Sequence, residues 1–163
     1  MAEKLAVRHG VSPRSARLAG MLHDLARLWR GDDLLAYAAG HGLPISDDER
    51  RAPVLLHAAI GAELARAEFG MSDPDVLGAI ARHTVARPGM TDLEKIVYVA
   101  DTIEPSRTYP EREALEAAAF RSLDEGLLGC VRESMRYLSV RRVRAAQETL
   151  QLYEELVQRA GAS

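Results

Sequence analysis

Hydrophobic and polar residues along the chain recur with the period of a helix rather than that of a strand. Ala, Leu, Glu and Arg dominate the sequence, and all four are strong helix formers. No window combines period-two alternation with the β-branched residues that are typical of strands. We therefore expect an all-α protein, built as a helical bundle without a β-sheet.

Breakers and capping residues predict the first two helices. Gly10 is expected to end a helix over residues 2–9, and Ser12 before Pro13 has the pattern of an N-cap followed by proline at the first helical position. The helix that follows carries five apolar side chains at helical spacing, namely Leu18, Met21, Leu22, Leu25 and Leu28. This spacing predicts one continuous apolar face.

The same signals predict further helices up to the middle of the chain. A short helix is expected over 32–39, and residues 46–51 hold at most one helical turn. Longer helices are expected over 53–69 and 74–84, because each starts at a proline in the first helical position. The next helix begins with Thr91 and Glu94 as a capping box and ends just before Pro105.

Length and composition place all of these helices in one domain over residues 1–163. The chain is long enough to bury a core without disulfide or zinc. Within it, residues 2–105 form the helices that carry candidate metal ligands. Residues 106–160 form C-terminal helices with weak breaks near Ser122 and Ser139.

Charge and apolar patterning exclude several classes of protein. Lys and Arg number 21 against 24 Asp and Glu, a formal net charge of −3, which argues against electrostatic binding to nucleic acid or to a membrane surface. No apolar run approaches the roughly 20 residues that span a bilayer, and residues 1–10 lack the apolar segment of a signal peptide. The single cysteine, Cys130, precludes an intramolecular disulfide and favours the cytoplasm.

Side chains that can bind a metal ion stand in apolar helical surroundings at four places. They are His23 with Asp24, His57, His83 and Asp101. Any one of these histidines alone is more often a core residue than a ligand. A buried carboxylate, however, is costly unless it is paired, hydrogen-bonded or bound to metal. Groups on four helices can converge at the centre of a bundle, where such sites are commonly built, so we predict a metal site.

The pair His23-Asp24 followed by the distant Asp101 resembles the HD superfamily of metal-dependent phosphohydrolases. Four segments resemble the bacterial YqeK family more specifically, namely residues 19–24, Leu56-His57, residues 80–84 and residues 90–107. The resemblance covers about residues 2–155 and implies a single HD-domain helical bundle. That family hydrolyses diadenosine tetraphosphate symmetrically to two ADP at a dinuclear, iron-containing site.

The resemblance also implies roles for individual residues. The metal ligands would be His23, Asp24, His57, His83 and Asp101. Asp24 would bridge two ions, and a metal-bound hydroxide would attack phosphorus. Iron is the expected metal, although Mn, Co and Zn stay open because histidine and aspartate ligands suit all four.

Cationic and hydroxyl side chains would bind the polyphosphate. Arg27 and Lys95 are implied to be catalytic with Asp24, and substrate would contact Arg27, Thr84, Lys95 and Arg107. On a straight helix Lys95 lies about 240° around the axis from Asp101, so it need not share the metal face. Glu104 is a candidate for holding Arg107 in place.

Several features of the sequence depart from the family pattern and leave alternatives open. The family's first histidine ligand precedes the segment that matches residues 2–9, and this sequence begins after it. Arg27 stands where lysine is usual, and Ala86 stands near a usual glycine. The alternatives are a catalytically weakened protein that binds an ADP- or GDP-like nucleotide, a phosphohydrolase acting on another nucleotide, and a helical scaffold without metal. A homodimer formed through the C-terminal helices is compatible with each of them.

Overall fold

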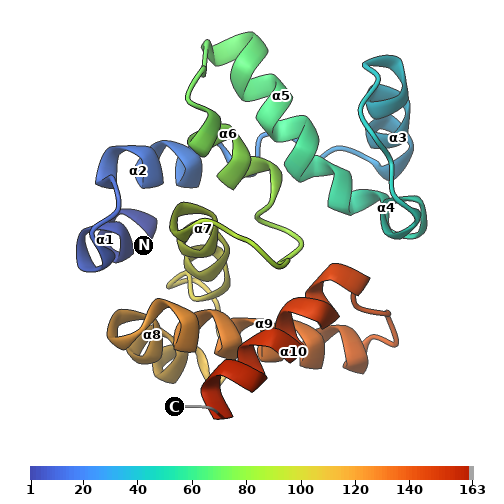
Figure 1. Ribbon diagram of the computed structural model, residues 1–163. Coiled ribbons are helices and arrows are strands. Elements are labelled where there is room, and N and C mark those ends of the chain that lie inside the picture. Colours follow the sequence, from blue (N-terminus) through green and yellow to red (C-terminus); the bar gives the residue numbers. More distant parts are fainter. Residues whose placement is uncertain (162–163) are drawn as a thin grey trace.

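The computed structural model describes residues 1–161, and all of its regular structure is helical (Figure 1). The elements are α1 (Ala2–His9), α2 (Pro13–Leu22), α3 (Gly31–Gly40), α4 (Asp47–Arg51), the 3-10 helix η1 (Pro53–Leu56), α5 (His57–Phe69), α6 (Pro74–Ala81), α7 (Asp92–Thr102), α8 (Arg112–Arg121), α9 (Leu123–Val140) and α10 (Gln147–Gly161). The all-α prediction is confirmed. Within residues 1–161 no helix combines the length and apolar character that crossing a membrane requires.

Local capping explains the boundaries that the sequence predicted correctly. Gly10 ends α1 with a left-handed φ of 70°, which glycine adopts without steric cost. The Ser12 side chain accepts a hydrogen bond from a backbone N–H in the first turn of α2. Thr91 and Glu94 form the predicted capping box at the start of α7. These signals act on groups within four residues, so the helix ends that they set can be predicted from the sequence alone.

α7 lies in the middle of the molecule and carries much of the core. In Figure 1 it stands between α1, α2 and α6 on one side and α8, α9 and α10 on the other, and it packs against α1, α2, α6 and α9. Its Ile96, Val97 and Val99 are buried in the larger of two hydrophobic clusters. The smaller cluster joins α3 to η1 and α5 through Leu34, Leu56 and other residues. The C-terminal end of α7 is thereby held beside α2 and α6.

The continuous apolar face predicted from Leu18 to Leu28 is wrong in two of its five positions. Met21 is 70% exposed and Leu28 is 96% exposed. Met21 lies within α2 but two residues from the buried Ala19, about 200° around the helix axis, so it faces solvent. Leu28 is exposed because α2 ends at Leu22 and the chain continues in turns, where helical spacing no longer decides which side chains face the core. The fully buried side chains of this segment are Ala16, Ala19 and Ala26.

Two other predicted helices have different bounds. The helix predicted over 53–69 begins as the 3-10 helix η1 and becomes α-helical only at His57. The helix predicted over 74–84 ends at Ala81. Both differences place a histidine at the end of a helix instead of inside it, since His57 opens α5 and His83 follows α6.

The backbones of α8 and α9 lie close together at Gly126. A Cβ atom on Gly126 would lie 2.5 Å from Ala119 Cα and 2.6 Å from Ala119 Cβ. We therefore expect Gly126→Ala to force the helices apart and to lower the free energy of unfolding by about 1–3 kcal/mol. Gly129→Ala is the matched control, because its Cβ would meet only the mobile end of Leu115. Urea denaturation compares the two variants, and equal losses would contradict the close approach at Gly126.

Candidate metal centre

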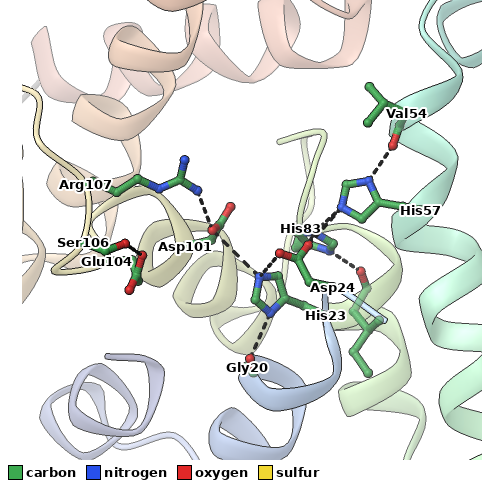
Figure 2. A network of polar contacts seen from close by, with 11 residues as sticks. Gly20, His23, Asp24, Val54, His57, His83, Asp101, Glu104, Ser106 and Arg107 are labelled. Carbon is green, nitrogen blue, oxygen red and sulfur yellow. Dashed lines mark hydrogen bonds and ion pairs between the residues drawn. The ribbon is translucent and has the colours of Figure 1, made fainter. Parts of the chain in front are cut away.

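The ends of four helices bring the five predicted ligands together (Figure 2). His23 is the C-cap residue of α2, Asp24 follows it, His57 opens α5, His83 follows the C-cap of α6, and Asp101 lies in the last turn of α7. The side chains converge as predicted, but at helix ends and not along the middle of a bundle. Helix ends leave backbone carbonyl groups without helical partners, and these carbonyls can orient the histidines.

Each of the three histidines uses its Nδ1 atom to bind the carbonyl group three residues earlier. The pairs are His23 with Gly20 at 2.9 Å, His83 with Ile80 at 2.8 Å, and His57 with Val54. An Nδ1–H that donates to a carbonyl leaves Nε2 of a neutral imidazole as an acceptor. The backbone therefore selects the tautomer in which the Nε2 lone pairs are available as ligands.

The Nε2 atoms surround the carboxylate of Asp24. Asp24 Oδ1 lies 3.2 Å from His57 Nε2 and 3.5 Å from His83 Nε2, while its Oδ2 lies 3.5 Å from His23 Nε2. The Nε2 atoms of His57 and His83 are 3.0 Å apart. Asp101 Oδ1 approaches His23 Nε2 from the other side, at 3.8 Å. One carboxylate thus faces three imidazoles at once.

This arrangement fits a divalent cation because acceptor atoms face one another. When the imidazoles are neutral, Nε2 and carboxylate oxygens are all acceptors, so only a proton or a cation can satisfy them. His23 Nε2 is buried and has no hydrogen-bond partner. One ligand atom from each of His23, Asp24 and His83 lies within 4.8 Å of the other two. The cluster could therefore bind a metal through nitrogen and oxygen ligands.

The same crowding shifts the pKa values of the cluster. Hydrogen bonds from His57 and His83 hold the pKa of Asp24 well below its ordinary value, against the opposing effect of burial. Burial lowers the pKa of His23, but Asp101, Asp24 and the Gly20 carbonyl together raise it further, so that it lies above 6.5. In the metal-free fold, a proton on His23 thus takes a place that a cation can occupy.

Metal affinity is therefore expected to rise with pH. A metal ion must displace the protons that are bound to its ligands. Because the pKa of His23 is raised, protons still compete with the metal for this imidazole above about pH 6.5. We expect a gain of roughly tenfold per pH unit for each proton displaced, over the pH range in which His23 is still protonated in the metal-free protein. Protonated His23 stabilises the metal-free fold fully below its unfolded pKa of 6.5, and this contribution is lost as pH rises through the folded-state pKa. The increase in Tm caused by Mn²⁺ should widen with pH, and a narrowing would contradict the assignment.

Arg107 joins the cluster from the loop after α7. Its Nη2 donates to Asp101 Oδ1 at 2.8 Å, and its side chain is 48% exposed. Burial raises the pKa of Asp101, but His23 and Arg107 lower it further, so that it lies below its ordinary value. Glu104 contacts Arg107 through the backbone, because the Arg107 N–H donates to the Glu104 carbonyl at 2.9 Å. The Glu104 carboxylate accepts a hydrogen bond from the Ser106 hydroxyl (Figure 2). A cavity of about 240 Å³ opens beside His23, Asp101 and Glu104.

The structure does not bring Lys95 to the cluster. Its Nζ donates to Asp92 Oδ1 at 3.2 Å and to Asp124 Oδ1 at 2.9 Å, which links α7 to α9. Arg27 is exposed in the turns after α2. Its backbone N–H donates to the Asp24 carbonyl at 3.0 Å, and its side chain makes no hydrogen bond or ion pair with the residues described. Thr84 is half-buried directly after His83 and lines a second cavity.

The ion pair between Arg82 and Glu94, beside His83, was not predicted from the sequence. Arg82 Nη1 donates to Glu94 Oε1, and the Glu94 side chain is only 4% exposed. The other carboxylate oxygen of Glu94 accepts from the backbone N–H of Thr91 at 3.1 Å. The pair joins the end of α6 to the start of α7, next to a candidate ligand. The capping box pointed to Glu94, but no sequence signal pointed to Arg82 as its partner.

Comparison with known proteins places this cluster in a family. The model of the HD domain matches residues 1–106, the part of the chain that carries all five candidate ligands. The chain belongs to the HD-domain family. Two similar proteins are named symmetrical bis(5'-nucleosyl)-tetraphosphatase. The protein of Bacillus subtilis (strain 168) is 35% identical over 94% of this chain and 82% of its own length. That of Halalkalibacterium halodurans is 33% identical over 94% and 81%.

The likeness of this HD-domain protein to a solved structure extends to the C-terminal helices. A Clostridium acetobutylicum protein, described as a predicted HD superfamily hydrolase involved in NAD metabolism, matches with a TM-score of 0.91 and 33% identity. The match covers 97% of this chain and 84% of the other. The relatives and this structure together confirm the family resemblance and the HD-domain helical fold.

Proposed function

We propose that this HD-domain protein hydrolyses diadenosine tetraphosphate symmetrically to two ADP with bound divalent metal. The observation that carries the proposal is the convergence of three histidine Nε2 atoms on Asp24. When the imidazoles are neutral, none of these facing atoms can donate a hydrogen bond. The names of the two relatives support the choice of substrate. Acceptor groups that are oriented by backbone carbonyls are typical of a site prepared for a cation.

His23, Asp24, His57, His83 and Asp101 would hold the metal. Both oxygens of Asp24 face imidazoles, Oδ1 toward His57 and His83 and Oδ2 toward His23, so one carboxylate can serve two ions. We infer a dinuclear site, with iron as the expected metal. When bound, such ions polarise phosphoryl oxygens and make water acidic enough to serve as a nucleophile near neutral pH.

The chain's own cations would orient the polyphosphate. Arg107 uses one nitrogen for Asp101 and is half-exposed, so its other N–H groups can donate to a phosphoryl oxygen. Arg27 follows Asp24 by three residues and is exposed, with its guanidinium unengaged by the residues described. The Thr84 hydroxyl adds a neutral donor beside His83. These groups would hold the substrate while charge develops at phosphorus.

The deciding experiment is product analysis. Purified protein is incubated with diadenosine tetraphosphate and Fe²⁺, Mn²⁺, Co²⁺ or Zn²⁺ in turn, and the nucleotides are separated by anion-exchange chromatography. We expect ADP as the only nucleotide product. A mixture of ATP and AMP would contradict symmetrical cleavage. Tight ADP binding without turnover by any metal form would instead favour the weakened nucleotide-binding alternative.

A further inference from the structure

A cavity of about 790 Å³ lies between α4, the segment that follows His83, and the start of α10. Figure 1 shows these three parts of the chain gathered on one side of the molecule. The volume is within the range of about 300–1,000 Å³ that is typical of small-molecule sites. The cavity is therefore large enough for part of a nucleotide.

The cavity adjoins the candidate metal centre. Thr84, which lines it, directly follows His83, and the lining residues Leu55 and Ala59 stand two residues on either side of His57. A ligand that fills this cavity therefore lies against the two backbone segments that carry His57 and His83.

Long-range hydrogen bonds hold the walls of the cavity together. The hydroxyl of the buried Thr149 in α10 donates to the carbonyl of Ala86 at 3.0 Å, which fixes the segment after His83 against α10. The backbone N–H of Gln147 donates to Asp48 of α4 at 3.4 Å. The cavity is thus enclosed by elements from three distant parts of the sequence.

The charges that line the cavity nearly cancel. It is lined by four arginines and four acidic residues, namely Arg51, Arg82, Arg87, Arg144, Asp47, Asp48, Glu49 and Glu148. Arg51 pairs with Asp48, Arg82 with Glu94, and Arg87 lies 3.9 Å from Glu148. A balanced lining does not concentrate positive charge for a polyphosphate. It suits an uncharged group that carries several donors and acceptors.

Side chains of the N-terminal part of α10 and of the segment before it supply such recognition groups. Arg144 is exposed and makes no hydrogen bond or ion pair with the residues described. Its planar guanidinium can stack on an aromatic base or donate to it. Gln147 and Gln151 line the same cavity with amides that both donate and accept. Apolar Ile45 and Val85 complete a lining that fits a purine base and its ribose.

We propose that this cavity binds one nucleoside of the dinucleoside polyphosphate, with the phosphate chain running past Thr84 to the metal centre. The inference rests on the proposed function. Cleavage in the middle of a four-phosphate chain leaves a nucleoside diphosphate on each side of the reacting phosphorus. A nucleoside-sized cavity next to the metal ligands provides the place for one of these halves.

Gln151→Trp tests the proposal by filling the cavity. Gln151 is exposed on α10, so a larger side chain can be accommodated without disturbing the core. We expect the KM for diadenosine tetraphosphate to rise by about tenfold or more. A tenfold rise corresponds to the binding free energy of one good polar contact. Inorganic tripolyphosphate, which has no nucleoside, should inhibit the variant and the wild type with the same Ki. Gln158→Trp is the matched control, because Gln158 lies two turns further along the same face and does not line the cavity.

Arg144→Gln provides a second, smaller change. We expect a KM increase of several-fold to about tenfold and a matching loss of ADP affinity by calorimetry. Arg14→Gln removes the same charge from an exposed site on α2 and should change neither quantity. Circular dichroism checks that each variant is folded.

Two results would overturn the proposal. An unchanged KM in both cavity variants would show that the nucleoside binds elsewhere. A tripolyphosphate Ki that rises in parallel with KM would show that the cavity holds phosphate. Failure of the proposed function is recognised separately, because wild-type protein would then produce no ADP from diadenosine tetraphosphate with any of the metals.

Discussion

Asp24→Asn is expected to abolish metal binding and to reduce hydrolysis by at least about a hundredfold. Removing a group that merely orients a metal ligand costs about ten- to a hundredfold in affinity or activity, and a ligand at the centre of the cluster should cost no less. The carboxylate of Asp24 lies within 3.5 Å of all three imidazoles, whereas Asp101 approaches only His23 among them. Elemental analysis of protein purified without chelator and single-turnover kinetics measure the two losses.

The same substitution should leave the metal-free fold intact. An asparagine amide donates two hydrogen bonds, and at about pH 8 these can satisfy histidine Nε2 lone pairs that the carboxylate cannot. The lowered pKa of Asp24 shows that its charge stabilises the metal-free fold. We therefore expect the Tm of the metal-free variant to lie slightly below that of the wild type, while the increase in Tm on adding Mn²⁺ disappears. Asp33→Asn, at an exposed position of α3, is the matched control and should retain the increase. Wild-type metal content in Asp24→Asn would show that Asp24 is not a ligand.

The helix boundaries and the five converging side chains were largely accessible to sequence reasoning because their signals are local or lie in motifs. Gly10, Ser12 and Thr91 act on backbone groups a few residues away. The His23-Asp24 pair and Asp101 stand out because polar groups in apolar surroundings need a partner. Their convergence was predicted because groups on four helices can meet at the centre of a bundle.

Features that depend on distant residues could not be obtained in this way. The apolar spacing continued past Leu22 although α2 ends there, which produced the false prediction for Leu28. Met21 is helical, but the packing of α2 buries the face that carries Ala16 and Ala19 instead. Lys95 has a partner on α9, Asp124, that follows it by 29 residues. Nothing in the spacing along one helix indicates such a partner, because the partner is chosen by the packing of two helices. The cavity next to the segment that follows His83 could not be predicted for the same reason, because one of its walls is α10, which is distant in the sequence.

Arg82→Ala is expected to lower the free energy of unfolding by about 1–3 kcal/mol, the cost of leaving a buried acceptor without its partner, because the Arg82 side chain itself is 39% exposed. The Glu94 side chain is 4% exposed and would keep only the hydrogen bond from the Thr91 backbone. Thr91→Ala removes the other half of the capping box and should lower the free energy of unfolding by about 1 kcal/mol. Comparing the two variants distinguishes the loss of helix capping from the loss of the ion pair. Urea denaturation of the metal-free proteins measures both losses.

Neutralising the buried partner should recover part of this loss. In the double variant Arg82→Ala/Glu94→Gln the amide can still accept the hydrogen bond from Thr91, and burying it costs much less than burying a carboxylate. We therefore expect the double variant to be more stable than Arg82→Ala alone, although Glu94→Gln by itself should destabilise the wild type. Two losses that simply add would show that the ion pair contributes little. A positive coupling would instead establish that α6 and α7 are held together at the histidine between them by this buried pair.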